Sequence, residues 1–313
     1  MIKTYAYAKI NITFEVLGRR GDGYHDIVSI LQEIDLKDTL RFESAASLTV
    51  VCHNVELRPS DNLVLKAAKL LKKECRYRGG AKIALKKGIP LAAGLGGGSS
   101  DAAAALVALN KLWKLELSTD ALVDLAAELG SDVPYFIRGG TSLAEGRGER
   151  ITPLPPLPQS CVVLLKPSVP VPESKTKEMY GALRPSHYSK GDYARKTAAF
   201  IESEVEGHQP PDSPNHGGIE RIGGHPQAPV RKNPVPLFQG YNAFDSVAFE
   251  MYEGMEWYWK QFMAAGAADV HLAGAGPTLF ALMRDRAAAG KVHRSLKELG
   301  LETYLVKTVS RDD

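Results

Sequence analysis

The chain has 313 residues, of which 44% are hydrophobic and 24% are charged, a composition typical of a globular protein with about two domains. Its 39 Lys and Arg residues nearly balance 36 Asp and Glu residues, so the formal charge is only +3 and a dedicated nucleic-acid-binding protein is not expected. The cysteines (Cys52, Cys75 and Cys161) are widely spaced and form no CxxC pair, which argues against a zinc knuckle or a disulfide framework.

The N-terminal segment carries no sign of a targeting signal. Its residues alternate between polar and apolar types, whereas a signal peptide has a continuous apolar core. No apolar run reaches the roughly 18 residues that a membrane span requires. We therefore expect a cytoplasmic protein with neither membrane nor nucleic acid among its partners, present as a monomer or weak homodimer.

The hydrophobic pattern of the N-terminal half predicts several strands and then helices. Residues 5–17 alternate as a strand, with Ile10 and Ile12 on a core face and Lys9 and Asn11 on the opposite face. Further strands are expected at 27–36, 38–43, 47–52 and 81–86. Helices are expected from Ser60-Asp61 to about Arg78, from Ser99 to about Leu112, and from Ser118 or Thr119 to about Leu129.

The Pro-rich segment 153–158 marks a change in organisation, and we place a domain boundary at about residue 150, between domains at 1–150 and 151–313. Strands are expected at 141–145, 161–166, 269–272, 278–283 and 301–309, and helices at 174–183, 190–204, 245–264 and 286–299. Residues 205–236 hold seven Pro and five Gly, which predicts a surface insertion that buries no core. Its histidines are too far apart for a compact metal site.

A glycine-rich segment between a predicted strand and a predicted helix carries the strongest chemical signal. It consists of Pro90, Leu91, Ala92, Ala93, Gly94, Leu95, Gly96, Gly97, Gly98, Ser99, Ser100 and Asp101. The glycines let backbone N–H groups turn toward an anion, and the N-terminus of the following helix adds partial positive charge. The two serines add hydroxyls suited to a phosphate or a phosphate-bound metal. The segment therefore predicts a polyphosphate cradle, although it matches neither the Walker A pattern nor the dinucleotide and hydrolase patterns.

Three other segments permit ordinary structural interpretations when each is taken alone. Lys9 on the first strand could be a solvated surface residue. Asp132, at a turn before an apolar run, could be a helix cap. The segment from His271 to Phe280 could be a tight turn between two strands.

Taken together, these segments resemble the GHMP kinase superfamily. The resemblance spans nearly the whole chain except 205–236, and its motifs are Tyr7–Asn11, Gly18–His25, Gly94–Asp101, Gly130–Phe136 and Gly274–Phe280. The turn Asp22-Gly23-Tyr24-His25 narrows it to the branch whose acceptor carries a cytidine diphosphate group on a methylerythritol unit, in non-mevalonate isoprenoid biosynthesis. The resemblance implies an α+β kinase with an N-terminal domain like ribosomal protein S5 domain 2, a ferredoxin-like C-terminal domain, and an active site between them that uses ATP and Mg²⁺.

The resemblance also implies roles for individual residues. Lys9 and Asp132 match the catalytic pair, and the segment from Pro90 to Ser100 matches the ATP-binding loop. Tyr24 and His25 match the cytidine-binding turn. The remaining matches are Tyr180 as a second stacking aromatic, Asn11 near the acceptor's diphosphate or hydroxyls, and Asn62 with Lys86 or Lys87 near the adenine. Tyr180 could instead be a core aromatic, and the metal ligands stay unknown.

The chain departs from the family pattern at two places, and alternatives remain open. Ala273 and Ala275 stand where the family more often has hydroxyls, and Ala243 stands where Asp is commoner. A mevalonate- or homoserine-type kinase is the alternative within the superfamily, although those substrates carry no base for Tyr24 and His25 to bind. A non-catalytic nucleotide-binding relative is the alternative outside catalysis, and the intact Lys9 and Asp132 argue against it.

Overall fold

The computed structural model describes residues 1–53, 62–205 and 240–310. The predicted helix start at Ser60-Asp61 and nearly all of the predicted insertion at 205–236 lie outside the described residues. Within the described ranges, the helices are too short or too polar for any of them to cross a membrane.

The first sheet is built on two long antiparallel strands, β1 (Ile2–Arg19) and β2 (His25–Ala45). The order β3-β4-β2-β1-β8 describes its main path, and β5 and β6 extend it beside β2. The other strands are β3 (Thr49–Cys52), β4 (Gly80–Lys86), β5 (Thr141–Gly146), β6 (Arg150–Pro153) and β8 (Tyr241–Asn242). The predicted strands 27–36 and 38–43 are therefore one strand, which stays paired with β1 across an irregularity at Tyr7/Ala8.

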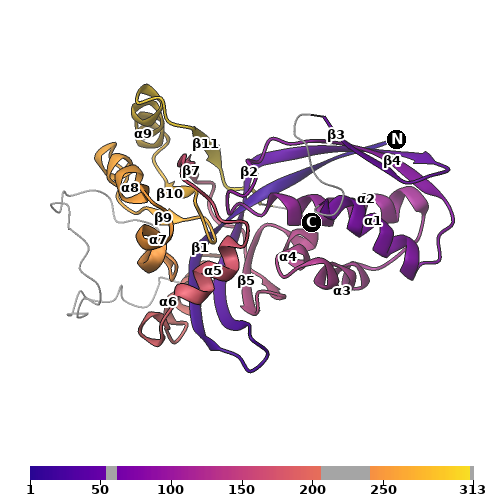
Figure 1. Ribbon diagram of the computed structural model, residues 1–313, viewed down its shortest axis with the longest axis horizontal. Coiled ribbons are helices and arrows are strands. Elements are labelled where there is room, and N and C mark those ends of the chain that lie inside the picture. The colour runs from indigo at the N-terminus through magenta and orange to yellow at the C-terminus, as the bar shows by residue number, and fades with distance from the viewer. Residues whose placement is uncertain (54–61, 206–239, 311–313) are drawn as a thin grey trace.

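Helices cover one face of this sheet (Figure 1). They are α1 (Leu63–Glu74), α2 (Gly97–Trp113), α3 (Thr119–Leu129) and α4 (Val133–Arg138). The sequence sets two of their starts, because Asn62 accepts hydrogen bonds from the first turn of α1 and Ser118 accepts one from the first turn of α3. Buried alanines of α2 pack in one core with Leu40 and Phe42 of β2, as the Ala-rich sequence of that helix predicts.

The second sheet is antiparallel, in the order β11-β7-β10-β9. Its strands are β7 (Cys161–Leu165), β9 (His271–Leu272), β10 (Leu279–Met283) and β11 (Thr303–Lys307). The C-terminal helices are α5 (Lys175–Ala182), α6 (Asp192–Val205), α7 (Asp245–Met251), α8 (Met255–Ala264) and α9 (Arg286–Glu298). The single helix predicted at 245–264 is wrong: Tyr252 is extended and Gly254 has a left-handed φ of 82°, so the chain turns between α7 and α8.

The interpretation of Lys9 as a solvated surface residue is also wrong. Lys9, Asn11, Thr13 and Glu15 alternate with the apolar residues as expected, yet none of them is more than 5% exposed. Ile10 and Ile12 pack in a core with Val162 and Leu164 of β7. The C-terminal half packs on the apolar face of this strand, and the polar residues on the strand are buried as well.

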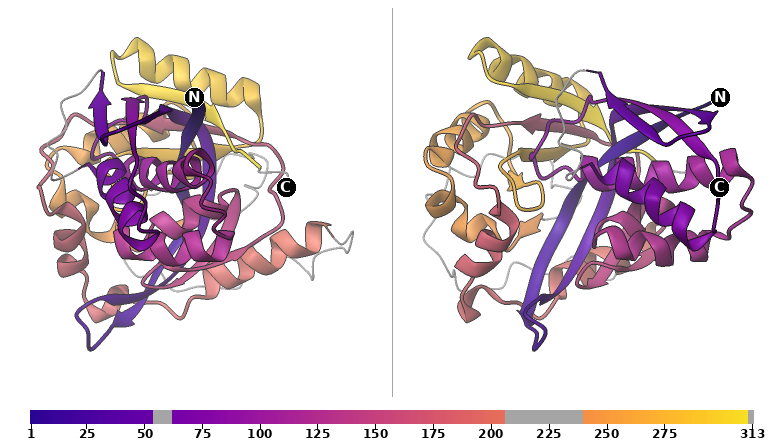
Figure 2. Two further views of the ribbon diagram at one scale, coloured as in Figure 1. Left: turned by 90° about the vertical axis from the view of Figure 1, so that its right-hand side faces the viewer. Right: turned by 45° about the vertical axis from the view of Figure 1, so that its right-hand side comes forward.

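The strands β1 and β2 cross the middle of the molecule and join its two halves (Figure 2). Phe14, Val16 and Ile27 share a core with residues of α7 and β10, and β8 pairs in parallel with β1. A division near residue 150 stays a prediction, because the first sheet draws strands from both sides of it.

A partly buried histidine ties β9 to α7. Nδ1 of His271 lies 2.6 Å from Oδ2 of Asp245, and Nε2 lies 2.8 Å from Oδ1 of Asp269. The ring of Phe280 is also nearby. Burial alone would lower the pKa of His271, but the two carboxylates outweigh it and raise that pKa to about 10. His271 is therefore an imidazolium at neutral pH.

The substitution His271→Gln should destabilise the protein by about 2 kcal/mol at pH 6, because it leaves two partly buried carboxylates without their cation. A histidine whose pKa is raised on folding stabilises most below its unfolded pKa of about 6.5. The difference from the wild type should shrink between pH 6.5 and about 10. Urea unfolding across this range measures it, with the exposed His53→Gln as control; a difference that does not change with pH would contradict the imidazolium assignment.

Candidate active site

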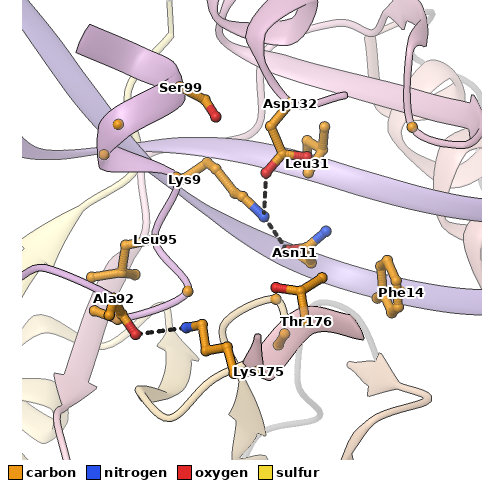
Figure 3. Close-up of a pocket in the computed structure, with 18 of the residues that line it drawn as sticks. Lys9, Asn11, Phe14, Leu31, Ala92, Leu95, Ser99, Asp132, Lys175 and Thr176 are labelled. Carbon is orange, nitrogen blue, oxygen red and sulfur yellow. Dashed lines mark hydrogen bonds and ion pairs between the residues drawn. The ribbon is translucent and has the colours of Figure 1, made fainter. Parts of the chain in front are cut away.

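A cavity of about 330 Å³ lies where the glycine-rich loop, β1, α5 and the turn at 274–275 meet (Figure 3). The sequence-predicted residues in its wall are Lys9, Asn11, Lys87, Pro90, Leu91, Ala92, Ala93, Gly94, Leu95, Gly96, Gly97, Gly98, Ser99, Asp132 and Tyr180. Folding thus gathers segments that are far apart in the chain around one space.

The ammonium of Lys9 contacts two other polar residues of this wall. It donates a hydrogen bond of 2.8 Å to Oδ1 of Asn11 and lies 3.4 Å from Oδ2 of Asp132. Asn11 in turn donates to Ser29 on β2, at 2.8 Å. Lys9 is buried, whereas the side chain of Asp132 is 43% exposed. The carboxylate is therefore accessible from the cavity, while the lysine that faces it is fixed in place.

Asp132 owes its position to the start of α4. It precedes the helix, but its side chain accepts no hydrogen bond from the first turn. Asp132 therefore occupies the N-cap position that the sequence allowed, but its side chain does not cap the helix, and its carboxylate points instead toward Lys9 (Figure 3).

The glycine-rich loop leads directly into α2, whose first residue is Gly97. Gly96 adopts a left-handed φ of 72°, and a Cβ on it would lie 2.8 Å from the ring of Phe136. The backbone of the loop also pairs with β1, because Lys9 N–H donates to the carbonyl of Leu95 at 3.0 Å. The loop is therefore held close to the catalytic candidates, with its helix N-terminus at the cavity.

The second glycine segment, at 274–276, packs against the first. A Cβ on Gly94 would overlap the carbonyl oxygen of Ala273 and come within 2.9 Å of that of Gly276. Gly274 and Ala275 line the cavity, so this segment is more than a tight turn between two strands.

A buried ion-pair cluster fixes the backbone just before the glycine-rich loop. Lys87 pairs with Asp38 and, at 2.7 Å, with Asp101 of α2. The other oxygen of Asp38 accepts from the N–H groups of Gly88 and Ile89, at 2.6 and 2.8 Å. Of the two adenine candidates, Lys87 lines the cavity and is buried, whereas Lys86 is exposed on β4. Burial alone would lower the pKa of Lys87, but the two carboxylates raise it above its ordinary value.

The predicted nucleotide contacts Ser99, Ser100 and Asn62 differ in how they lie relative to the cavity. Ser99 lines the cavity, whereas Ser100 is buried and lies outside the cavity wall, so its phosphate contact stays a prediction. Asn62 is buried, and its side-chain oxygen accepts from the N–H groups of Val64 and Leu65. Its contact with adenine stays a prediction, as does the phosphate contact of Ser99.

The predicted base-binding aromatics lie at one end of the cavity. His25 stacks on Tyr180, with ring centroids 4.8 Å apart and an interplanar angle of 16°. Burial and the charge of Arg19 lower the pKa of His25, so the ring is neutral at pH 7. Tyr24 is exposed, and its ring lies 4.9 Å from the guanidinium of Arg147, which lines the cavity. Tyr180 is therefore in the cavity wall, whereas Tyr24 and His25 border it.

Sequence reasoning missed four polar residues in the wall, namely Ser29, Arg147, Lys175 and Thr176. Lys175 and Thr176 lie at the start of the predicted helix that carries Tyr180. Their position on the same helix as a predicted site residue could have indicated that they line the cavity. Ser29 and Arg147 come from a strand and a turn without a recognisable motif.

Comparisons with known proteins agree on one group. The family model described as GHMP kinases N terminal domain matches residues 62–140, and the one described as GHMP kinases C terminal matches residues 234–301. A protein of Dehalococcoides mccartyi strain BAV1, named 4-diphosphocytidyl-2-C-methyl-D-erythritol kinase, is 39% identical over 309 residues, which cover 99% of each chain.

Solved structures resemble the chain over its whole length. A crystal structure of 4-(cytidine 5'-diphospho)-2C-methyl-D-erythritol kinase aligns with a TM-score of 0.75 and 28% identity, covering 99% of this chain and 100% of its own. A homoserine kinase from Cytophaga hutchinsonii aligns with a TM-score of 0.69 at 17% identity, covering 99% and 94%. The second likeness is one of fold alone.

The substitution Gly94→Ala should lower the free energy of unfolding by about 2 kcal/mol or more, because the left-handed backbone and the carbonyl of Ala273 both oppose a Cβ. Gly98→Ala is the matched control, since a Cβ there meets only Leu63 at 3.6 Å and helix propensity favours Ala. Urea unfolding measures both; equal stability of the two variants would show that the glycine segments do not need this close approach.

Proposed function

The chain belongs to the 4-diphosphocytidyl-2-C-methyl-D-erythritol kinases of the GHMP kinase superfamily, and we propose that it phosphorylates the 2-hydroxyl of 4-diphosphocytidyl-2-C-methyl-D-erythritol. The phosphoryl donor is ATP, and the products are the 2-phosphate and ADP. This reaction belongs to non-mevalonate isoprenoid biosynthesis. The observation that carries the proposal is the pairing of Lys9 with Asp132 beside a glycine cradle, in a chain 39% identical to a kinase of that name.

Asp132 is the general base in this proposal. Its carboxylate is exposed to the cavity and is not used to cap α4, so it is available to accept the proton of an acceptor hydroxyl. A base works only within hydrogen-bond reach of the proton it accepts, and the cavity leaves space for an acceptor beside Asp132.

Lys9 orients Asp132 and stabilises negative charge. Its ammonium lies between Asn11 and Asp132, so it can contact both the base and the oxygen that loses the proton. Phosphoryl transfer depends mainly on positioning and on electrostatic stabilisation of the transferred group. Asn11, whose amide is fixed by Ser29, is placed to bind the acceptor's hydroxyls or diphosphate.

The glycine-rich loop binds the phosphates of ATP through its N–H groups and the start of α2. Among the described residues, His, Cys, Asp and Glu form no group of three that could hold a metal ion. Mg²⁺ nevertheless fits, because it binds through few protein oxygens together with substrate phosphates and water. The hydroxyl of Ser99 is the candidate protein ligand. When bound, the ion would neutralise charge on the β- and γ-phosphates.

The aromatic group at the end of the cavity supplies acceptor specificity. We assign Tyr24, His25 and Tyr180 to the cytosine base, for which the stacked pair of His25 and Tyr180 and the nearby Tyr24 provide flat surfaces and polar edges. A neutral His25 can both donate and accept a hydrogen bond. Mevalonate and homoserine have no base for such a group to bind.

An ADP-release assay with Mg-ATP and a panel of acceptors tests the proposal. We expect turnover with 4-diphosphocytidyl-2-C-methyl-D-erythritol and none with mevalonate, homoserine or galactose, because only the first carries a base. Turnover with another member of the panel would show that the protein is a kinase with a different acceptor from the one proposed. Silence with all four, together with measurable ATP binding, would indicate a non-catalytic relative.

The substitution Asp132→Asn should lower kcat by roughly 10²-fold or more, because it removes the base and leaves the shape of the site. Its affinity for ATP should stay close to that of the wild type. Steady-state kinetics and ATP titration measure the two effects. Asp120→Asn is the matched control, since that exposed carboxylate pairs with Arg138 at 2.6 Å and lies outside the cavity wall. Near-normal turnover of Asp132→Asn would refute the assigned role.

A further inference from the structure

Lys175, the first residue of α5, joins the two glycine segments. Its ammonium donates a hydrogen bond of 2.6 Å to the carbonyl of Ala92, in the glycine-rich loop, and another to the carbonyl of Gly276. Figure 3 shows the side chain extending from the start of α5 to Ala92. Lys175 is partly buried and lines the cavity.

The carbonyls that Lys175 contacts belong to two residues with a left-handed backbone. Ala92 has a positive φ of 53°, which is uncommon for a residue with a side chain, and Gly276 has a φ of 69°. Both residues flank the point where Gly94 meets Ala273. Lys175 therefore stabilises the two segments in the arrangement that forms the phosphate side of the cavity.

The charge of Lys175 is not balanced by the protein that surrounds it. Among the residues that the structure describes, no carboxylate lies within ion-pair distance of this ammonium, and Glu178 on the same helix accepts instead from the hydroxyl of Ser174. Asp132 pairs with Lys9. A cation that is removed from water without an anionic partner is unfavourable, and burial together with Lys9 lowers the pKa of Lys175 to about 8.

We propose that Lys175 binds a phosphate group of a ligand held in this cavity. The inference rests on the proposed function, which brings two sources of phosphate into the same space: the polyphosphate of the nucleotide and the diphosphate of the acceptor. In either case the phosphate supplies the negative charge that no described carboxylate provides to Lys175. The two carbonyls hold the ammonium at the junction of the glycine segments until the phosphate arrives.

Equilibrium binding separates this role from a purely structural one. Isothermal titration calorimetry of the full chain with ADP, CDP, adenosine and cytidine measures the part of each affinity that the phosphates contribute. Lys175→Met should weaken binding of ADP or of CDP about tenfold or more and leave the nucleosides unchanged, since a charge-assisted contact is lost. Lys175→Arg should retain most of the affinity. Lys177→Met is the matched control, because Lys177 is an exposed lysine of the same helix.

Proton uptake provides a second readout. At pH 8 the free Lys175 is about half protonated, so binding of a phosphate to wild-type protein should take up as much as about half a proton. Lys9 is the facing charge on β1, and the nucleotide phosphates are already ionised at this pH. Titrations in two buffers of different ionisation enthalpy measure the uptake, which Lys175→Met should lose and Lys177→Met should keep.

The outcomes distinguish the ligand and the hypotheses. A loss confined to ADP assigns Lys175 to the nucleotide, and a loss confined to CDP assigns it to the acceptor. Unchanged affinities and proton uptake in Lys175→Met, or equal weakening of nucleosides and nucleotides, would overturn the inference. Wild-type protein that binds both nucleotides but transfers no phosphate would overturn the proposed function alone, whereas binding of neither would overturn both.

Discussion

Burial of β1 on both faces obliges each polar side chain on that strand to find a partner, because an unpaired polar group in the interior is costly. Lys9, Asn11 and Ser29 meet this requirement as a chain of hydrogen bonds that ends at the carbonyl of Thr13. The same chain leaves one direction of the Lys9 ammonium facing Asp132. Stability and reactivity thus draw on one network, in which the fold fixes the lysine before any ligand binds.

Charge in the cavity is arranged unevenly around that network. Lys87 is matched by two buried carboxylates and acts as an anchor for the loop. Lys9 pairs with the partly exposed Asp132. Lys175 of α5 and Arg147 of the β5–β6 turn also line the cavity. Low-dielectric walls strengthen the effect of such a surplus on a bound anion. The site is therefore suited to ligands with several phosphates, and an unphosphorylated acceptor would use little of this charge.

The sequence predicted the parts of the structure that depend on local pattern or motif. The strands, most helices and the glycine-rich loop follow from periodicity and turn residues, and the GHMP resemblance brought Lys9 and Asp132 together. Contacts between distant segments were not predictable: nothing near Lys9 in the sequence indicates that the C-terminal half covers its strand. Gly254 lies within an apolar pattern that predicts one continuous helix, although its backbone is left-handed. Nothing in the sequence around Lys175 indicates that its ammonium contacts the carbonyl of Ala92.

The helix α5 connects the two ends of the cavity. Tyr180 packs against His25 at the aromatic end, and Lys175 contacts the glycine segments at the other, five residues or about 7.5 Å away along the helix axis. The helix is only eight residues long, so one short element contributes to both ends of the cavity. An acceptor base bound at Tyr180 and a phosphate bound at Lys175 would therefore contact the same short helix, so the geometry of α5 sets the spacing between the two ligand groups.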